Sequence, residues 1–164
     1  MRKIYQLGII LVFVCLQPMI GFAQQPGTTK YKCLVQMTNY VGEGAYIVVS
    51  LVDSKGAYEK TLYVMGADKK WYKTLKEWHA AFSKKPANIS AVTGASVAGG
   101  DRSVTVLEID NAKMNAGYKL RFETAVEDKP YYQKDLELPL TTEGIAGKTE
   151  GTGYIRYVRL SPNN

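Results

Sequence analysis

The stretch AYIVVSLVDSKGAYEKTLYVM, residues 45–65, decides the class of fold. Its first half, Ala45 to Asp53, is apolar at nearly every position from Ile47 to Val52, which is typical of a strand that is covered on both faces. Ser54-Lys55-Gly56 then forms a tight turn signal, and Tyr58 to Met65 follows as a second strand. The stretch therefore predicts a β-hairpin.

Five further segments have the alternation of a strand and are separated by turn signals. They are Lys30 to Asn39, Arg102 to Ile109, Tyr118 to Glu127, Lys134 to Leu140 and Gly153 to Leu160. In Tyr118 to Glu127, positions 120, 122, 124 and 126 should point inward and the charged positions 119, 121, 123 and 127 outward. Seven strands predict an all-β, immunoglobulin-like sandwich.

One short helix interrupts the strands. Trp71, Leu75, Trp78 and Phe82 are spaced four, three and four residues apart, which places them on one helical stripe. Asp68 is a suitable N-cap and Pro86 stops the helix. We expect the stripe to pack across an open end or edge of the sandwich. A long connection of 19 residues, Ser83 to Asp101, follows without a sustained period, and such connections usually have a task or are disordered.

The N-terminus has the pattern of a secretory signal at residues 1–23. Arg2 and Lys3 precede an apolar run from Leu7 to Leu16, and Gly21-Phe22-Ala23 supplies small residues at the exit. The run is too short for a stable membrane span. We therefore expect residues 24–164 to form a single periplasmic or extracellular domain that does not itself span a membrane.

The composition of this expected mature chain argues against several classes of function. Without Arg2 and Lys3 the 21 basic residues become 19 against 15 acidic ones, a scattered net charge of +4 that gives no footprint for nucleic acid. Cys33 and His79 are then the single cysteine and histidine, so no metal site or Ser-His-Asp triad is expected. Cys33 lies on an apolar face and should be buried. The glycines of residues 144–153 do not precede a helix pattern, which favours a flexible hairpin over a phosphate loop.

Four segments together resemble a known family. They are YIVVSLVDSKGAYEKTLYVMG (46–66), KKWYKTLKEWH (69–79), TGAS (93–96) and NAGYKLRFETAVE (115–127). The pattern resembles the predicted periplasmic domains of unknown function, DUF2271-type, that occur beside PepSY membrane proteins and flavin transferases. Some members are labelled flagellar hook-capping-like. The resemblance covers about Tyr31 to Leu160.

The segment Thr93-Gly94-Ala95-Ser96, within the long connection, is similar to the acceptor motif of proteins that carry covalent FMN. The resemblance implies that Ser96 is the FMN attachment point and that Thr93, Gly94, Ala95 and Ser90 are read by a flavin transferase. Ser90 stands where the motif usually has Asp, and Ser96 where it more often has Thr. Small residues leave the backbone uncrowded for the transferase. Trp71, Trp78 and loop amides are candidates for contact with the flavin ring.

These features give a leading hypothesis and an alternative. The leading hypothesis is a secreted electron carrier that holds FMN on Ser96, is modified by a flavin transferase and exchanges electrons with a PepSY-type membrane redox protein. Such a protein needs no catalytic acid or base, because the cofactor performs the redox step. The alternative is a cofactor-free, immunoglobulin-like binding module of a cell-envelope complex.

Overall fold

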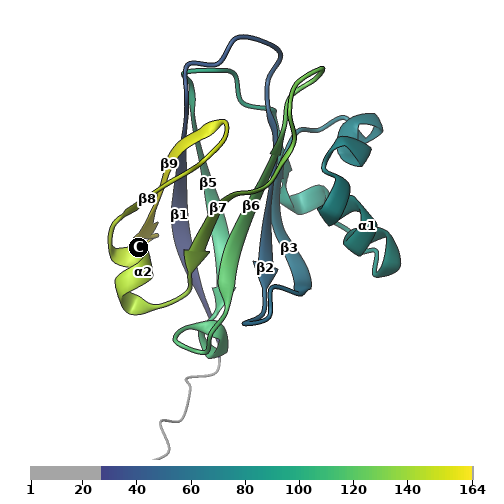
Figure 1. Ribbon diagram of the computed structural model, residues 1–164. Coiled ribbons are helices and arrows are strands. Elements are labelled where there is room, and N and C mark those ends of the chain that lie inside the picture. The colour runs from purple at the N-terminus through teal and green to yellow at the C-terminus, as the bar shows by residue number, and fades with distance from the viewer. Residues whose placement is uncertain (1–26, 164) are drawn as a thin grey trace, which may run out of the picture.

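The computed structural model describes residues 27–163, which form a sandwich of two packed β-sheets (Figure 1). The all-β sandwich expected from the sequence is therefore confirmed. The secretory signal expected at residues 1–23 lies outside the described residues. Within residues 27–163, no helix is both long and apolar enough to cross a membrane.

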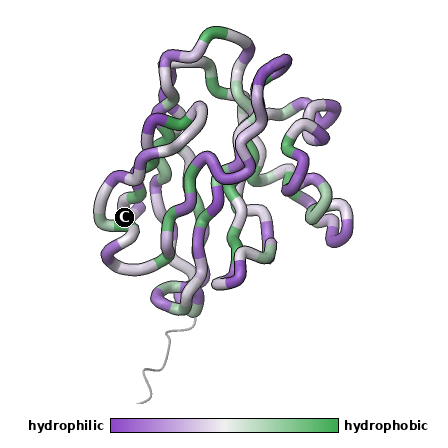
Figure 2. The backbone as a smooth tube through the Cα atoms, viewed as in Figure 1, coloured by the Kyte–Doolittle hydropathy of each residue, from purple (hydrophilic) through white to green (hydrophobic). Residues whose placement is uncertain are grey.

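All seven expected strands are present, and their ends differ from the expected ones by no more than two residues. They are β1 (Thr28–Met37), β2 (Tyr46–Val52), β3 (Tyr58–Met65), β5 (Arg102–Asp110), β6 (Lys119–Ala125), β7 (Tyr132–Pro139) and β9 (Ile155–Pro162). Two short strands are additional, β4 (Thr93–Gly94) and β8 (Lys148–Glu150). Hydrophobic and hydrophilic residues interchange repeatedly along the strands (Figure 2).

The strand order is β5-β1-β9-β8 in one sheet and β4-β3-β2-β6-β7 in the other. All pairs of strands are antiparallel except β3 and β4. The constant immunoglobulin domain places its first strand in a different sheet from its last. Here β1 and β9 are neighbours, so "immunoglobulin-like" describes the layered architecture, with a strand order of its own.

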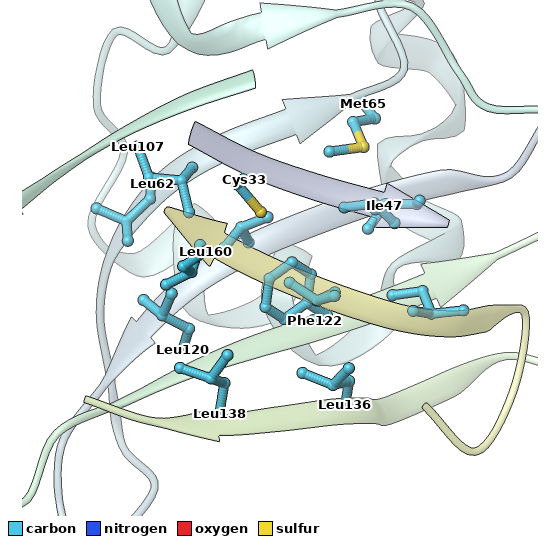
Figure 3. Packing of buried hydrophobic residues seen from close by; sticks show 14 of the residues in the cluster. Cys33, Ile47, Leu62, Met65, Leu107, Leu120, Phe122, Leu136, Leu138 and Leu160 are labelled. Atoms are coloured by element: carbon cyan, nitrogen blue, oxygen red, sulfur yellow. The ribbon is translucent and has the colours of Figure 1, made fainter. Parts of the chain in front are cut away.

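The main core lies between the two sheets (Figure 3). Cys33 of β1 and Phe122 of β6 are fully buried in it, together with leucines from β6 and β7. This confirms the inward face expected for both β1 and β6. Burial of each large aliphatic or aromatic side chain contributes about 1.5–3 kcal/mol, so the contact between the sheets dominates the stability of the fold.

The outward face of β6 differs from the expectation. Arg121 and Glu123 alternate with the core residues as expected, but they are only 8% and 3% exposed. Arg121 Nε donates to Glu137 Oε1 of β7 at 2.8 Å. Glu123 is covered by the helical segment that follows β3. A charged residue on the outward face was expected to meet solvent, and tertiary packing replaced that solvent with protein partners.

The helical segment is two helices rather than one. A 3-10 helix, Lys69–Thr74, is followed after Leu75 by α1 (Lys76–Lys84). The side chain of Asp68 accepts from Lys70 N at 3.1 Å, which confirms it as the N-cap, and α1 ends two residues before Pro86. The 3-10 turn has about 3.0 residues per turn in place of about 3.6, which changes which residue faces the sheet. Tyr72 is buried in place of Trp71.

This segment covers the middle of the five-stranded sheet, and not an end or edge of the sandwich as expected. Tyr72, Leu75 and Trp78 form a second core with residues of the outer face of that sheet, among them Val48 and Val64. In Figure 1, α1 lies beside β3 on the side of the molecule away from β9. The apolar run of residues 47–52 is therefore buried on both faces, as its sequence predicts.

The connection Ser83 to Asp101 is more ordered than its sequence suggests. It includes the end of α1, a 3-10 turn at Ser90–Val92 and the strand β4. The segment of residues 144–153 also differs from a flexible hairpin, because it contains part of α2 (Thr142–Ala146) and β8. The hydroxyl of Thr141 accepts from Gly144 N at 2.9 Å and begins this short helix.

Candidate functional site

The segment of residues 93–97 is fixed to the rest of the sandwich at both of its ends. Thr93 and Gly94 pair in parallel with Val64 and Met65 of β3. Val97 and Ala45 exchange two backbone hydrogen bonds, of 2.8 and 3.1 Å, and Val97 is 5% exposed. Ala95 and Ser96 form a short exposed arch between these two anchors.

Local contacts fix the residues on either side of the arch. A Cβ atom on Gly94 would lie 2.6 Å from the hydroxyl oxygen of Tyr63, so this position cannot hold a larger residue without displacing that ring. The Thr93 hydroxyl donates to Ile89 O at 2.8 Å, which fixes the approach to the arch. The Tyr40 hydroxyl donates to Val97 O at 2.7 Å, which fixes the exit.

Ser96 is exposed and lies over the backbone of the β1–β2 connection. A Cβ atom on Gly44 would come within 2.6 Å of Ser96 Oγ, so the glycine allows the serine side chain to lie close to this connection. The serine hydroxyl is therefore accessible while its backbone is held in place. An accessible hydroxyl on a fixed backbone is what a protein must offer if a separate enzyme is to modify that hydroxyl.

Two hollows meet at Ser96. One, of about 180 Å³, is lined by Tyr46 and Trp71 together with Glu43, Gly44, Thr74, Ala125 and Glu127. The other, of about 220 Å³, is lined by Tyr63, Asp101, Arg102 and Ser103 together with residues 94–97. Ser96 is the one residue that lines both of them, so a group attached to its hydroxyl has two adjacent surfaces to rest on.

The first hollow has two aromatic walls, Tyr46 and Trp71, and two acidic residues, Glu43 and Glu127. Burial raises the pKa of the Tyr46 phenol above its usual value of 10.0, so the hydroxyl stays protonated. Trp71 is half-buried, and Lys70 Nζ lies 5.3 Å from the centre of its ring. Trp71 and Ser96 line the same hollow, so a planar ring attached to Ser96 could stack on the indole ring of Trp71.

Trp78, the other tryptophan named as a candidate for flavin contact, is not available. It is 1% exposed, its ring stacks on Phe82 at 5.0 Å, and its indole N–H donates to Thr61 Oγ1 at 2.8 Å. The helical stripe that suggested it is a packing face. Trp78 therefore belongs to the second core.

Ser90 is exposed and lines neither hollow. Its backbone N–H donates to Asn88 Oδ1 at 3.0 Å at the start of the 3-10 turn. Of the five residues implied by the resemblance, Gly94, Ala95 and Ser96 line the same hollow, while Thr93 lies beside them on β4. Ser90 is separated from them by this turn.

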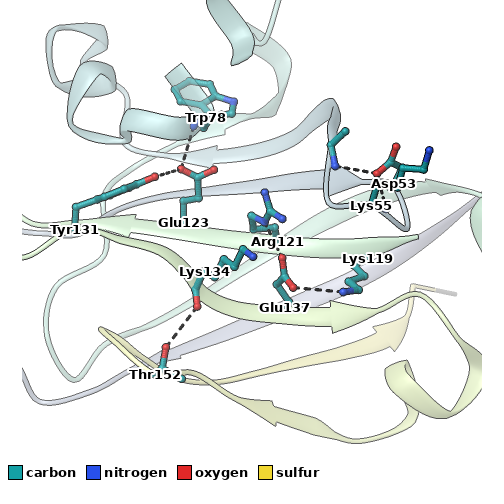
Figure 4. A network of polar contacts seen from close by, with 11 residues as sticks. Asp53, Lys55, Trp78, Lys119, Arg121, Glu123, Tyr131, Lys134, Glu137 and Thr152 are labelled. Atoms are coloured by element: carbon teal, nitrogen blue, oxygen red, sulfur yellow. Dashed lines mark hydrogen bonds and ion pairs between the residues drawn. The ribbon is translucent and has the colours of Figure 1, made fainter. Parts of the chain in front are cut away.

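Two buried acidic residues were not identified from the sequence. Glu123 Oε2 accepts from the backbone N–H of Trp78 at 3.1 Å and from the Tyr131 hydroxyl at 2.6 Å (Figure 4). Burial raises the pKa of Glu123 above 4.5, and the bonds from Tyr131 and Trp78 partly oppose this. The bond from Trp78 to Glu123 attaches the helical segment to β6, which is a structural role.

Asp135 of β7 is the second buried acid. Its carboxyl oxygens accept from the backbone N–H groups of residues 152–155 and from the Thr124 hydroxyl, at 2.6–3.1 Å. A Cβ atom on Gly151 or Gly153 would lie 2.7–2.8 Å from this carboxyl group, so the glycines allow the backbone to close around it. These amides do surround an anion, but the anion belongs to the protein itself.

Cys33 is fully buried, and burial raises the pKa of its thiol to about 12, so it is inert. Among residues 27–163, no three His, Cys, Asp or Glu side chains are placed to hold a metal ion. The accessible hydroxyl of Ser96 is the group that the geometry sets apart.

Comparison with known proteins gives one match. The model of a family described as "Predicted periplasmic protein (DUF2271)" matches residues 28–157, a range that includes the arch and both hollows. No curated protein and no solved structure gives a significant match.

Proposed function

The chain belongs to this family of periplasmic proteins, DUF2271, and on that premise we propose that it carries FMN covalently on Ser96 and transfers electrons in the periplasm. The family match agrees with the location expected from the secretory pattern of residues 1–23. The family description itself names no cofactor, substrate or partner. The proposal therefore depends on the Thr93–Ser96 motif and on the geometry around it.

The observation that carries the proposal is the placement of Ser96. The hydroxyl is exposed, the arch is anchored at β4 and at Val97, and Trp71 lines the adjoining hollow. An anchored arch limits the conformations of an attached group, and a half-buried aromatic ring offers it a stacking surface. The aromatic wall therefore fits the ring system of a flavin attached at Ser96.

The modification can be written with a balanced set of bonds. Ser96 Oγ forms a phosphoester bond to the FMN phosphate of FAD, the pyrophosphate bond of FAD breaks, AMP leaves, and the serine proton is released. A flavin transferase with Mg²⁺ would catalyse this step. The bound flavin would then supply the redox chemistry, while Trp71 and Tyr46 exclude water from one side of the attachment point.

The partners follow from the family resemblance and form part of the proposal. A flavin transferase would load the protein, and a PepSY-type membrane redox protein would exchange electrons with it. The exposed position of Ser96 supports both steps, because transferase and redox partner must each reach the same arch. In this account the protein is an electron carrier and not a stand-alone enzyme.

The test is co-expression with a periplasmic flavin transferase, followed by intact-mass measurement. Wild-type protein should gain one FMN less a water and remain yellow after denaturation. Ser96→Ala should abolish the gain, and Thr93→Ala should reduce it because that position is read but not modified. Ser90→Asp should increase it by restoring the usual carboxylate.

Ser54→Ala is the matched control, because Ser54 is exposed in the β2–β3 turn and distant in sequence from the arch. It should be loaded as the wild type is. Colourless wild-type protein, made with a transferase proven on another substrate, would contradict the proposal. Full loading of Ser96→Ala would contradict the assignment of the acceptor.

One observation favours the alternative, a cofactor-free binding module. Val104 and Val106 of β5 are 62% and 43% exposed, which is high for valines in a strand. Exposed apolar residues on a sheet face are found at sites of protein contact. If the wild type stays colourless under the conditions above, this face becomes the leading candidate for a function.

A further inference from the structure

A third hollow, with a different chemistry, is lined by residues of the four-stranded sheet. This sheet lies on the side of the molecule away from α1 (Figure 1). Its volume is about 450 Å³. Leu34 of β1 and Tyr157 of β9 line it, and the residues that connect α2 to β8 form one wall. Ser96 does not line this hollow, although Arg102 lines both it and the second hollow at Ser96.

The lining carries three positive charges and no negative one. They belong to Arg102 of β5, Lys148 of β8 and Arg159 of β9. Within residues 27–163, neither arginine forms an ion pair. Lys148 pairs with Glu150 at 3.6 Å, but both side chains are more than half exposed, so the pair neutralises little of the charge.

Two of these charges are placed directly opposite each other. Lys148 and Arg159 are partners in the antiparallel register of β8 and β9. Like charges opposite each other in a sheet destabilise the pairing, and β8 has only three residues with which to offset this. An anion bound between the two side chains would turn this repulsion into attraction.

The hollow is large enough to hold a small molecule. Its volume is within the range of small-molecule sites. Tyr157 offers an aromatic surface, with Lys148 Nζ 5.4 Å from the ring centre, and Leu34 lies beside Arg159 in the β1–β9 register. A Cβ atom on Gly147 would meet nothing within 4 Å, so the wall is open at that point.

We propose that this hollow binds a small organic polyanion, a molecule with at least two negative charges from phosphate or carboxylate groups and an apolar body that rests on Tyr157. Arg159 and Lys148 hold the charged groups, with Arg102 at the far side. Arg102 Nε donates to Gln36 Oε1, which orients its guanidinium group at this edge. Guanidinium groups bind phosphate and carboxylate through two parallel hydrogen bonds, so the arginines supply most of the affinity.

The test uses flavin-free protein and four probes: inorganic phosphate, pyrophosphate, citrate and phenyl phosphate. Binding is followed by NMR titration of backbone amides and by calorimetry. We expect saturable binding of citrate or phenyl phosphate, with shifts concentrated at residues 147–148 and 157–159 and an affinity that falls as salt is added. The phosphate and carboxylate probes distinguish the two sources of charge.

Arg159→Gln and Lys148→Gln should each weaken binding by about tenfold or more, because each removes a charged hydrogen bond. Arg156→Gln is the matched control, since Arg156 is exposed on the same strand but does not line the hollow. Gly147→Glu introduces an acid into open space and should abolish binding without disturbing the fold. Circular dichroism checks that each variant is folded.

Three results would overturn the proposal. The first is no saturable binding of any probe at millimolar concentration. The second is equal affinity in wild type and Arg159→Gln. The third is binding of phosphatidylglycerol vesicles or of poly-glutamate without binding of the small anions, which would identify the face as a surface for membranes or acidic proteins.

Discussion

Removal of the Asp135 carboxyl group should destabilise the protein by about 4 kcal/mol in the variant Asp135→Ala. This side chain is fully buried on β7 and accepts five hydrogen bonds of 2.6–3.1 Å. Four of the donors are backbone N–H groups of residues 152–155, which lead into β9, while β7 belongs to the other sheet. The carboxyl group therefore joins the two layers of the sandwich at one end.

The magnitude follows from the donors that would lose their acceptor. Thr124, Tyr154 and Ile155 are 0%, 6% and 0% exposed, so their donor groups have little access to replacement water. Each unsatisfied buried donor costs about 1–3 kcal/mol, so the three together cost about 3–9 kcal/mol. Partial relaxation of the loop places the total in the lower half of this summed range, at about 4 kcal/mol. Thr152 and Gly153 lie nearer the surface and can bind water.

The assay is urea unfolding followed by tryptophan fluorescence, with Asp135→Asn and Glu150→Gln measured alongside. Asparagine keeps the shape and one acceptor oxygen, but its NH₂ group would face backbone N–H groups, so Asp135→Asn should also be destabilising. Glu150 is exposed on β8, and its variant should lie within about 0.5 kcal/mol of the wild type. A loss below about 1 kcal/mol for Asp135→Ala would refute the reasoning, because it would mean that the donors find other partners.

Three further outcomes are expected. Burial raises the pKa of Glu123 above 4.5, so the folded state holds this proton more tightly than the unfolded state. The free energy of unfolding of the wild type, relative to that of Glu123→Gln, should therefore fall as the pH rises from 4.5 through the raised pKa. Parallel pH profiles of the two free energies would contradict this. Cys33, with a thiol pKa of about 12, should resist maleimide in native protein at pH 8 and react once urea unfolds it; rapid native labelling would show that the thiol is accessible. Trp78→Ala should cost about 3–5 kcal/mol and Trp71→Ala less than about 1 kcal/mol, since only the former is fully buried, and equal losses in urea unfolding would exclude the packing described.

The strands could be located from the sequence because their signals are local. A period of two residues and a turn such as Ser54-Lys55-Gly56 depend only on neighbouring positions. The burial of Cys33 follows from the same alternation, and the burial of residues 47–52 on both faces follows from their continuous apolar character. The motif Thr93–Ser96 is equally local, which is why it could be noticed without a structure.

The conformation and position of the helical segment could not be predicted from local sequence patterns. Its apolar spacing predicted a packing face but gave neither the break at Leu75 nor the sheet face on which it lies. The 3-10 turn changes the spacing by a fraction of a residue per turn, which is enough to bury Tyr72 in place of Trp71. This also decided which tryptophan stands beside Ser96.

The sequence by itself determined the seven long strands and the inward faces of β1, β6 and β7, and it suggested a candidate acceptor hydroxyl, because each of these depends on a pattern within a few residues. The tertiary structure alone decided what surrounds them. The partners of Glu123 and Asp135, the two hollows at Ser96 and the three cations around Tyr157 come from segments far apart in the chain. Such groups depend on strand order and register, and neither periodicity nor composition encodes which strands become neighbours.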